Sequence, residues 1–583
     1  MLEDILLQVK KPAQYIGQEW NVSRKDFQAS QIKFALCFPD LYEIGMSNLA
    51  LRIIYDILNS LPEVCCERFF APDTDMEGIL RSSNTRIPSL ESHRPLREFD
   101  IIGFSLGSEL DYTNILNILD LGSIPLEAGL RDHTYPLVIG GGPCVLNPEP
   151  MHEFFDLFVV GEAEELLLEF ISLWRRHKEE YRSGKMSKQD LLLAFSRIPG
   201  IYVPSLYEVR YNPQGRIEKF SVKIEGAPEK VKKRIVGDLN TLSFPVRWLV
   251  PYIQIVHDRV TLEVMRGCPN RCRFCQARSQ YYPFRQKDLK NILDSACRAY
   301  KNTGYEEISL GGLSVSDHSQ IVDISEGLLK IFSKDAVSVS LPSIKARPQV
   351  SGISSSIAKV KKTGLTFAPE AGSERLRQLL AKDFNERDFL DSISGAYNSG
   401  YQHIKLYFMA GLPGETKEDL DSIIEFSRRA SELKREITRS PAQVNISVNT
   451  FIPKPHTPLQ WLGMEGMEGM QEKKNYLLDK TRNKRLKLNF HNCQMSFLEG
   501  VLCRGDRRMG GVISAAFKKG ARFDAWADHF ALDKWLDAFK ECAIEPDSYL
   551  REKSPDEILP WDFIDIGIDK EYLLAEFNKT IAR

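Results

Sequence analysis

Short apolar runs that alternate with helical stretches are the feature that most restricts how this chain can fold. In the first part of the sequence the apolar runs lie at 33–38, 100–106, 136–139 and 157–160, and the helical patterns at 46–61, 112–121 and 164–174. Buried strands separated by helices are typical of a mostly parallel sheet with helices on both faces. The sequence therefore predicts an α/β fold that begins with a doubly wound sheet.

A second, longer series of strand and helix patterns follows. Its apolar runs lie at 259–265, 307–310, 338–341, 365–368, 403–409 and 444–451, with helical stretches such as 291–303 and 420–433 between them. Six such units are fewer than the eight of a complete barrel, so a partial, TIM-like (β/α)6 barrel is predicted. We expect the loops after its strands to carry the chemistry.

The length of the chain calls for several domains, because its 583 residues far exceed the roughly 150 that serve as a prior for one. Five regions are expected: an N-terminal arm (1–30), the doubly wound sheet (31–177), a connector with a small antiparallel element (178–248), the barrel (249–470) and a small α+β C-terminal extension (471–583). The extension is expected to begin with a basic helix over 471–488.

Charge and hydropathy exclude several classes of protein. Lys and Arg number 77 against 79 Asp and Glu, so a net charge of -2 offers no overall basic field to attract nucleic acid or an anionic membrane. The N-terminus lacks a signal-peptide pattern, and no apolar run approaches the roughly 18 residues of a membrane span. We therefore expect a cytoplasmic protein without membrane contact.

The 11 cysteines are too sparse for a disulfide framework.

Three of these cysteines lie close together, in the loop that follows the first barrel strand. Cys268, Cys272 and Cys275 have the spacing Cys-x3-Cys-x2-Cys. Thiolates this close can hold one soft metal centre, and three ligands leave one iron of a cubane cluster open to bind a substrate. The alternative is a structural zinc site completed by His257. Zinc sites usually use two cysteine pairs, and no second pair follows here.

With Phe274 as the aromatic residue before the last cysteine, this motif resembles that of the radical S-adenosylmethionine (SAM) superfamily. The resemblance implies that Cys268, Cys272 and Cys275 hold a [4Fe-4S] cluster whose open iron chelates SAM. It also implies reductive cleavage of SAM to a 5′-deoxyadenosyl radical, with an external one-electron reductant of the flavodoxin or ferredoxin type. The cofactors supply this chemistry, and the protein orients them.

Further loops after the barrel strands resemble SAM-binding elements of the same superfamily. Gly311 and Gly312 resemble its Gly-Gly-Glu element, although Leu313 replaces the glutamate. By the same resemblance the expected contacts with SAM are Phe274, Gly311, Gly312, Glu370, Gly411 and Ile452. Each loop alone could be an ordinary turn, whereas their common position behind one cysteine motif favours a binding site.

Loops of the first sheet resemble those of cobalamin-binding domains, which have a flavodoxin-like fold. The residues that carry this resemblance follow strands, at the carboxyl edge where doubly wound sheets bind ligands: Asp40, Tyr42, Gly45, Ser105, Gly140 and Gly141. Tyr42 replaces the usual histidine, and a neutral phenol is a poor cobalt ligand. Either cobalamin binds with its lower face free or blocked by Tyr42, or the domain has kept the fold without the vitamin.

Segments 11–17, 455–461 and 504–508 extend the resemblance over nearly the whole chain, to one subfamily of B12-binding-domain radical SAM proteins. The implied function is a radical SAM enzyme that methylates or rearranges a substrate that the sequence does not identify. RNA is one candidate, because 473–487 contains seven Lys or Arg against one Asp and arginines follow at 504–508. A solvated helix face and a structural Arg and Asp loop would give the same pattern.

Catalytic residues cannot be assigned from these motifs. His456 and Glu499 could act as acid or base on the substrate side, and either could equally serve packing. The alternative function of a different class is a zinc-stabilised RNA-binding protein.

Overall fold

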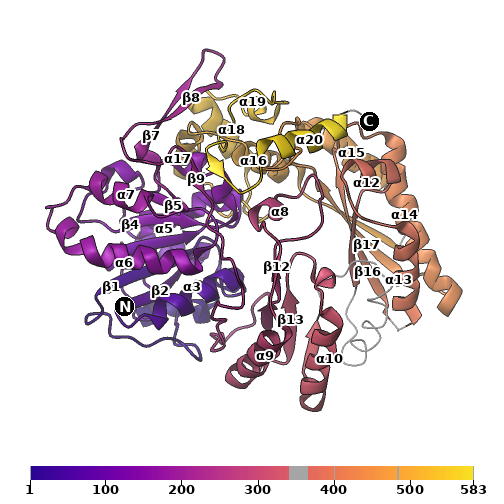
Figure 1. The fold of residues 1–583 in the computed structure, drawn as a ribbon, viewed down its shortest axis with the longest axis horizontal. Helices are drawn as coiled ribbons and strands as arrows, with labels where there is room; N and C mark the ends of the chain where they lie inside the picture. Colours follow the sequence, from indigo (N-terminus) through magenta and orange to yellow (C-terminus); the bar gives the residue numbers. More distant parts are fainter. Residues whose placement is uncertain (1, 341–364, 399–400, 482–484, 582–583) are drawn as a thin grey trace.

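The computed structural model describes residues 2–340, 365–398, 401–481 and 485–581 (Figure 1). Its N-terminal part is a six-stranded sheet in the order β2-β1-β3-β4-β5-β6. The strands are β1 (Ile32–Phe38), β2 (Val64–Phe70), β3 (Ile101–Ser105), β4 (Leu137–Gly141), β5 (Leu157–Val159) and β6 (Ile201–Tyr202). Strands β1 to β5 are parallel and only β6 is antiparallel to its neighbour, which confirms the predicted doubly wound α/β sheet.

Helices cover both faces of this sheet, as Figure 1 shows. They are α2 (Tyr42–Gly45), α3 (Leu49–Ser60), α4 (Thr74–Ser82), α5 (Tyr112–Leu121), α6 (Ala163–Arg182) and α7 (Lys188–Ser196), after a short α1 (Leu2–Leu6). The predicted helix at 112–121 forms with those bounds, and the one at 164–174 extends to Arg182.

Strand β2 was not among the predicted strands, because Glu67 and Arg68 interrupt its apolar pattern. Both side chains are buried in the structure. Glu67 accepts hydrogen bonds from Ser89 and Ser92, and Arg68 pairs with two glutamates. Partners from distant loops therefore satisfy the polar groups that made this stretch look unlike a buried strand.

The connector contains the antiparallel element that the sequence predicts, formed by β7 (Tyr207–Tyr211) and β8 (Ile217–Val222). It also contributes β6 to the N-terminal sheet and β9 (Val231–Lys232), which pairs with β19 (Ile564–Asp565) near the C-terminus. The connector therefore ties the first sheet to the end of the chain.

The barrel region consists of two parallel sheets. One contains β10 (Val260–Glu263), β13 (Glu307–Gly311) and β14 (Ser338–Ser340), and the other β15 (Leu365–Glu370), β16 (His403–Ala410), β17 (Gln443–Thr450) and β18 (Leu486–Phe490). Its helices are α8 (Gln276–Gln280), α9 (Leu289–Thr303), α10 (Ile321–Phe332), α12 (Glu374–Leu379), α13 (Glu386–Asn398), α14 (Lys417–Thr438) and α15 (Met467–Lys480). The six expected strands form, with Leu341 outside the described residues.

The predicted basic helix over 471–488 is wrong in its second half. Helix α15 ends at Lys480, and β18 then adds a parallel strand beside β17. The run Leu486–Phe490 alternates apolar and polar residues, with Leu486 and Phe490 buried. That two-residue period suits a strand, but the surrounding charges hid it.

The C-terminal extension is mainly helical, with α16 (Cys493–Cys503), α17 (Met509–Lys518), α18 (Leu532–Glu541), α19 (Asp547–Leu550) and α20 (Lys570–Ile581). Helices α16 to α18 share one hydrophobic core with the N-terminal sheet, and Figure 1 shows them above it. They therefore complete the first domain. Among the described residues, no helix is long and apolar enough to cross a membrane.

Candidate functional site

The three cysteines lie in one half-buried loop that begins at a constrained glycine. Gly267 has φ of +81°, and a Cβ at this position would lie 2.7 Å from the Tyr281 carbonyl oxygen. The turn therefore requires glycine. The Asn270 amide donates to Cys268 Sγ at 3.2 Å, and the Cys275 N–H donates to the Cys272 carbonyl at 3.3 Å. These contacts fold the loop back on itself, so that the three thiols lie near one another.

The thiols influence each other electrostatically. Burial raises the pKa of Cys272 to about 11, with smaller contributions from Cys275, Glu370 and Cys268 against the charge of Lys382. As they stand, no three His, Cys, Asp or Glu side chains of the described residues form a group that could hold a metal ion. A bound cluster would therefore need the three thiols to turn toward a common centre.

The donor set itself fits an iron–sulfur cluster with three protein ligands. Cys268, Cys272 and Cys275 supply soft thiolate ligands from a single short loop. His257, the proposed fourth ligand of a zinc site, instead has its Nδ1 3.4 Å from the Arg259 guanidinium, and its backbone N–H donates to Ser47 Oγ. One ring nitrogen of the proposed fourth zinc ligand therefore contacts an arginine.

An ion pair lies beside the thiols. Glu370 ends β15 with φ of +70°, and its carboxylate is 3.1 Å from Lys382 Nζ. Burial raises the pKa of Glu370, and the charge of Lys382 opposes this effect. Both side chains are electrostatically coupled to Cys272 and Cys275. The structure therefore brings Glu370 to the cysteine loop, and it adds Lys382, which no sequence motif singled out.

The other residues expected to bind SAM also follow strands of the barrel. Gly311 and Gly312 lie at the end of β13, and Gly312 packs so tightly that an added Cβ would be 2.5 Å from Met265 Cγ. Gly411 follows β16 with φ of +83° and donates its N–H to Glu415. Ile452 follows β17. These positions are compatible with contact to SAM, which stays a prediction.

A small apolar cluster joins several of these loops. Phe274, between the cysteines, packs against a group that includes Ala371, Leu412 and Phe451, which follow β15, β16 and β17. The loops after three strands therefore meet around the aromatic residue of the cysteine motif. An apolar floor of this kind excludes water from a reacting centre.

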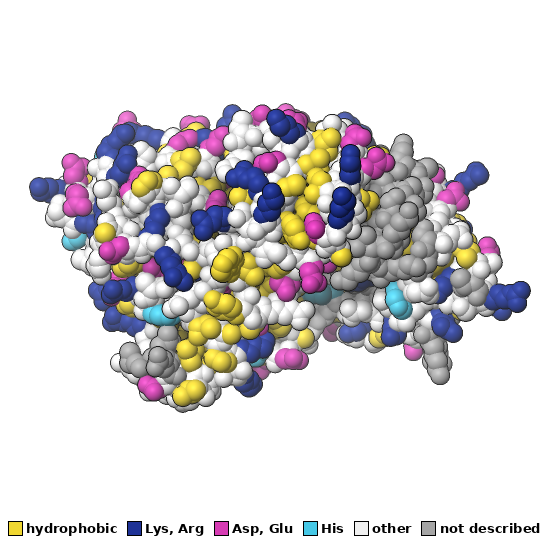
Figure 2. Space-filling view, turned by 90° about the horizontal axis from the view of Figure 1, so that it is seen from below, with side chains coloured by type: hydrophobic (Ala, Val, Ile, Leu, Met, Phe, Trp, Pro, Cys, Tyr) yellow, Lys and Arg dark blue, Asp and Glu magenta, His cyan; other side chains and the backbone are white. Residues whose placement is uncertain are grey.

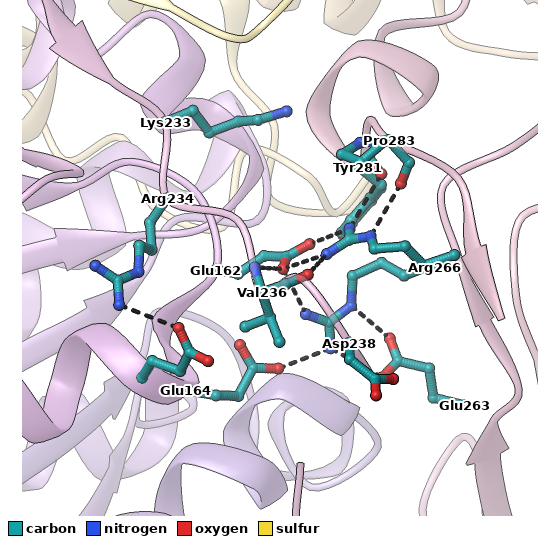
Figure 3. A network of polar contacts seen from close by, with 12 residues as sticks. Glu162, Glu164, Lys233, Arg234, Val236, Asp238, Glu263, Arg266, Tyr281 and Pro283 are labelled. Atoms are coloured by element: carbon teal, nitrogen blue, oxygen red, sulfur yellow. Dashed lines mark hydrogen bonds and ion pairs between the residues drawn. The ribbon is translucent and has the colours of Figure 1, made fainter. Parts of the chain in front are cut away.

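The strand just before the cysteines is held by a network of charges that sequence reasoning missed (Figure 3). Arg266 in β11 (Met265–Arg266) lies 2.7 Å from Glu164, 2.9 Å from Glu263 and 3.3 Å from Glu162. Arg285 in β12 (Arg285–Gln286) pairs with Glu162 at 2.6 Å. The two glutamates at the start of α6 thus attach the first sheet to the strand that leads into the cysteine loop.

The pKa of Glu162 reflects this network. Burial alone would raise it, but hydrogen bonds from Arg285 and the charge of Arg266 outweigh burial and hold it below its usual value. The partners are separated by more than 100 residues, for example Arg285 and Glu162. In the sequence, only the Gly-Glu-x-Glu turn after β5 could have indicated that Glu162 and Glu164 belong to such a network.

At the first sheet, Tyr42 lies in the protein interior. It is 2% exposed, its hydroxyl donates to Glu19 at 2.9 Å, and its ring packs edge-on against Phe70. A Cβ at Gly45 would lie 2.2 Å from the Phe70 ring. Packing therefore accounts for both residues, and Tyr42 is not presented to a ligand.

The glycines after β4 have a similar explanation. A Cβ at Gly140 would approach Leu106, Phe155 and Phe158 to 3.0 Å. Gly141 and Ser105, which pair with each other across β3 and β4, are half-buried. The close approach of neighbouring side chains thus favours glycine at 140 without any ligand.

The C-terminal extension covers the carboxyl edge of this sheet. Asp40 accepts a hydrogen bond from Trp526 Nε1 at 2.9 Å, and Thr113 donates to Asp524 at 2.9 Å. Asp111 is buried, and its Oδ1 has no hydrogen-bond partner among the described residues. Burial and the charges of Asp40, Glu109 and Asp524 raise its pKa. The C-terminal extension therefore occupies part of the edge where a corrin would bind, and these contacts do not favour the vitamin.

His456 and Glu499, the candidates for acid–base roles, differ in their surroundings. His456 is buried, its Nε2 lies 3.1 Å from the Leu146 carbonyl oxygen, and burial lowers its pKa to about 3. A neutral packing role fits this contact. Glu499 lies 2.7 Å from Lys454, which also pairs with Glu109, and these side chains are 10–26% exposed. An acid–base role for Glu499 stays a prediction.

The arginines at 504–508 are paired within the protein. Arg504 is fully buried and donates to four carbonyl oxygens, those of Pro453, Gln460, Tyr549 and Arg551. Arg507 pairs with Glu149, and Arg508 with Asp506. Upstream, Lys473 pairs with Glu415 and Glu465. These contacts favour the structural interpretation of the basic segment over phosphate binding, while Arg482 to Lys484 lie outside the described residues.

Comparison with known proteins agrees with the position of the cysteine loop. Residues 262–427 match the model of the radical SAM superfamily, and residues 50–204 match the model described as "Radical SAM proteins, N-terminal". The first match contains the three cysteines and four of the barrel strands that are predicted to carry the SAM site. The second covers most of the N-terminal sheet.

Two curated relatives have limited identity. The chain is 28% identical to Uncharacterized protein MJ0966 of Methanocaldococcus jannaschii over 88% of this chain and 97% of that protein. It is 22% identical to Uncharacterized methyltransferase PH0819 of Pyrococcus horikoshii over 42% of this chain, and spans 51% of that protein.

Among solved structures, the chain is similar to the cobalamin-dependent radical SAM enzyme OxsB with aqua-cobalamin bound. The TM-score is 0.45 at 15% identity, over 100% of this chain and 85% of the other. The two family matches, together with the three thiols in the expected loop, identify this chain as a radical SAM enzyme. Its N-terminal domain is of the type found in radical SAM proteins.

Proposed function

We propose that this enzyme cleaves SAM reductively at a [4Fe-4S] cluster held by Cys268, Cys272 and Cys275. The observation that carries the proposal is the packing of Phe274, which lies between Cys272 and Cys275, against the loops after β15, β16 and β17. When bound, the cluster would supply one electron, taken from a flavodoxin or ferredoxin type of donor, and SAM would yield methionine and a 5′-deoxyadenosyl radical.

The chain's own residues would bind and orient these groups. The three thiolates would hold three irons and leave the fourth for the amino and carboxylate groups of SAM. Gly312 allows Met265 to pack closely at the end of β13, and the Glu370–Lys382 pair places a carboxylate and an ammonium beside the thiols. Phe274 and Leu412 would keep water from the radical.

Anaerobic reconstitution of the full chain with iron and sulfide tests this proposal. We expect a brown protein that forms 5′-deoxyadenosine from SAM only when dithionite is added, as measured by chromatography. A colourless protein that retains zinc and forms no 5′-deoxyadenosine would contradict the proposal and favour the zinc-stabilised alternative.

For the N-terminal domain we propose the second of the two possibilities, a cobalamin-type fold that works without the vitamin. Tyr42 is engaged with Glu19, and Trp526 covers Asp40 at the edge where the corrin would bind. The methylating, cobalamin-dependent form of the function is therefore the less favoured one, and a methylation or rearrangement that uses SAM alone is preferred.

The expected result is that the full chain retains no cobalamin after incubation with hydroxocobalamin and gel filtration, as judged by its visible spectrum. Tyr42→Phe, which removes only the hydroxyl bonded to Glu19, should leave cobalamin retention and cluster assembly unchanged. This part of the proposal would be overturned if the unaltered chain retained cobalamin stoichiometrically and the Asp40→Asn variant did not.

A further inference from the structure

A cleft lies between the N-terminal arm, α3 and the end of the connector. Its volume is about 800 Å³, and it is lined by residues of 18–24, of α3 and of 245–252. Ligand sites commonly have roughly 300–1,000 Å³. The cleft is therefore large enough for a small organic ligand or one unit of a polymer.

Two aromatic side chains stand at this cleft with most of their surface in solvent. Trp20 is 66% exposed and Tyr252 is 62% exposed. Trp20 Nε1 donates to the Asn302 carbonyl at 3.3 Å, and Tyr252 Oη donates to the Gln18 carbonyl at 2.6 Å. Each ring is thus fixed at its polar atom while its faces stay open. Pre-positioned rings lose little entropy when a planar ligand stacks on them.

Two arginines at the same cleft are available to an anion. Arg24 and Arg247 are exposed, and neither guanidinium donates a hydrogen bond to any of the described residues. The nearby Lys25 differs, because its ammonium donates to the carbonyls of Leu61 and Val64. A chain with a net charge of -2 therefore has, in a cleft that also contains two exposed aromatic rings, two arginines whose guanidinium groups make no hydrogen bond with the described residues.

Two carboxylates line the cleft, Glu19, which pairs with Arg68, and Asp56 of α3. Asp56 of α3 is half-buried, burial raises its pKa, and the charge of Arg247 opposes this rise. Behind it, the buried Arg52 donates to the carbonyls of Met46 and Leu249 and stacks on Trp248, which makes this wall rigid. A carboxylate in this position can accept hydrogen bonds from the amino group of a base.

The cleft is remote from the cysteine loop along the barrel axis. Asn302, which anchors Trp20, lies at the end of α9, just before β13 begins, whereas the cysteine loop follows β10. The cleft is thus near the amino ends of the strands, and the candidate SAM site is at their carboxyl ends. Figure 2 views the molecule from below and shows hydrophobic side chains among Lys and Arg on that face.

We propose that this cleft binds a nucleotide unit, with its base stacked on Trp20 or Tyr252 and its phosphate paired with Arg24 and Arg247. Stacking on an aromatic ring tolerates any base, and guanidinium groups match phosphate oxygens with two parallel hydrogen bonds. An apolar ligand would leave both arginines unused, and a cationic ligand would be repelled by them. The unit could be a free nucleotide or part of a single-stranded RNA.

Binding to the full chain tests the proposal without the cluster or SAM. Isothermal titration calorimetry compares AMP with adenosine and with inorganic phosphate, which represent the two halves of a nucleotide. Fluorescence anisotropy with a fluorescein-labelled oligouridylate tests whether the nucleotide unit belongs to an RNA strand. We expect AMP or the oligonucleotide to bind at least about tenfold more tightly than adenosine or phosphate, a factor of ten being about 1.4 kcal/mol. Tighter binding of the RNA identifies a strand, and equal binding identifies a free nucleotide.

Trp20→Leu and Arg247→Gln should each weaken binding of the preferred probe about tenfold or more, as expected for loss of one stacking or phosphate contact. Arg210→Gln, at an exposed arginine of β7 outside the cleft, is the matched control and should bind normally. Thermal unfolding of each variant checks its fold. Phosphate that binds as well as AMP, or binding that none of the cleft variants alters, would overturn the proposal.

Discussion

Replacing Cys272 with alanine will abolish reductive cleavage of SAM and remove most of the iron that the reconstituted protein retains. One thiolate fewer leaves two protein ligands for a cluster that needs three, and no other cysteine lies in this loop. We expect 5′-deoxyadenosine formation to fall by more than roughly 100-fold, since even altered partners of metal ligands cost about 10- to 100-fold. Iron and sulfide analysis and the visible spectrum measure the loss of the cluster directly.

The matched control is Cys297→Ala, which removes another half-buried thiol, in α9 of the same barrel. This variant should keep its iron content and its cleavage activity. If Cys272→Ala cleaved SAM as well as Cys297→Ala does, Cys272 would not be a ligand and the assignment of the whole motif would be wrong.

The parts of the fold that the sequence predicted well are those set by local patterns. The cysteine loop, the strands around it and helix α5 all depend on short periodic runs, which local rules describe. Strand β2 depends instead on Glu91 and Glu19, which lie far from Arg68 in sequence and neutralise its buried charge. A single sequence does not reveal such partners, so this strand was missed.

The loops of the first sheet show a different limit of sequence reasoning. Glycine at 45 and 140 is consistent with a ligand loop, but the structure shows side chains of the protein in that space. The same holds for the arginines at 504–508, whose direction is invisible in the sequence. A motif defines which residue types are present, whereas the packing of neighbouring elements decides whether they face a ligand.

The arginine before the cysteine loop illustrates how such distant partners influence the site. Arg266 is 7% exposed at its side chain, and three glutamates lie within 3.3 Å of it. Two of them, Glu162 and Glu164, belong to the first domain, and Glu263 belongs to β10. Since Cys268 follows two residues later, Arg266 acts as a positioning residue that couples the docking of the domains to the geometry of the thiols.

Replacing Arg266 with alanine should therefore have the largest effect on stability. Removing one partner of a buried ion pair leaves uncompensated charges and costs about 3–5 kcal/mol, and here Glu162 keeps Arg285 while Glu164 and Glu263 lose their nearest cation. We expect a lower thermal unfolding midpoint, faster proteolysis in the connector and weaker retention of iron.

A conservative variant separates positioning from simple destabilisation. Lysine at 266 keeps the charge but cannot form the forked hydrogen bonds to Glu164 and Glu263, so Arg266→Lys should recover much of the stability and only part of the iron content. Arg298→Ala removes an arginine of α9 whose pair with Asp294 is exposed, and should cost at most about 1 kcal/mol. If Arg266→Ala were as stable as Arg298→Ala and retained its full iron content, the network would have no part in holding the cysteine loop. A loss of stability with normal iron retention would limit Arg266 to joining the two domains.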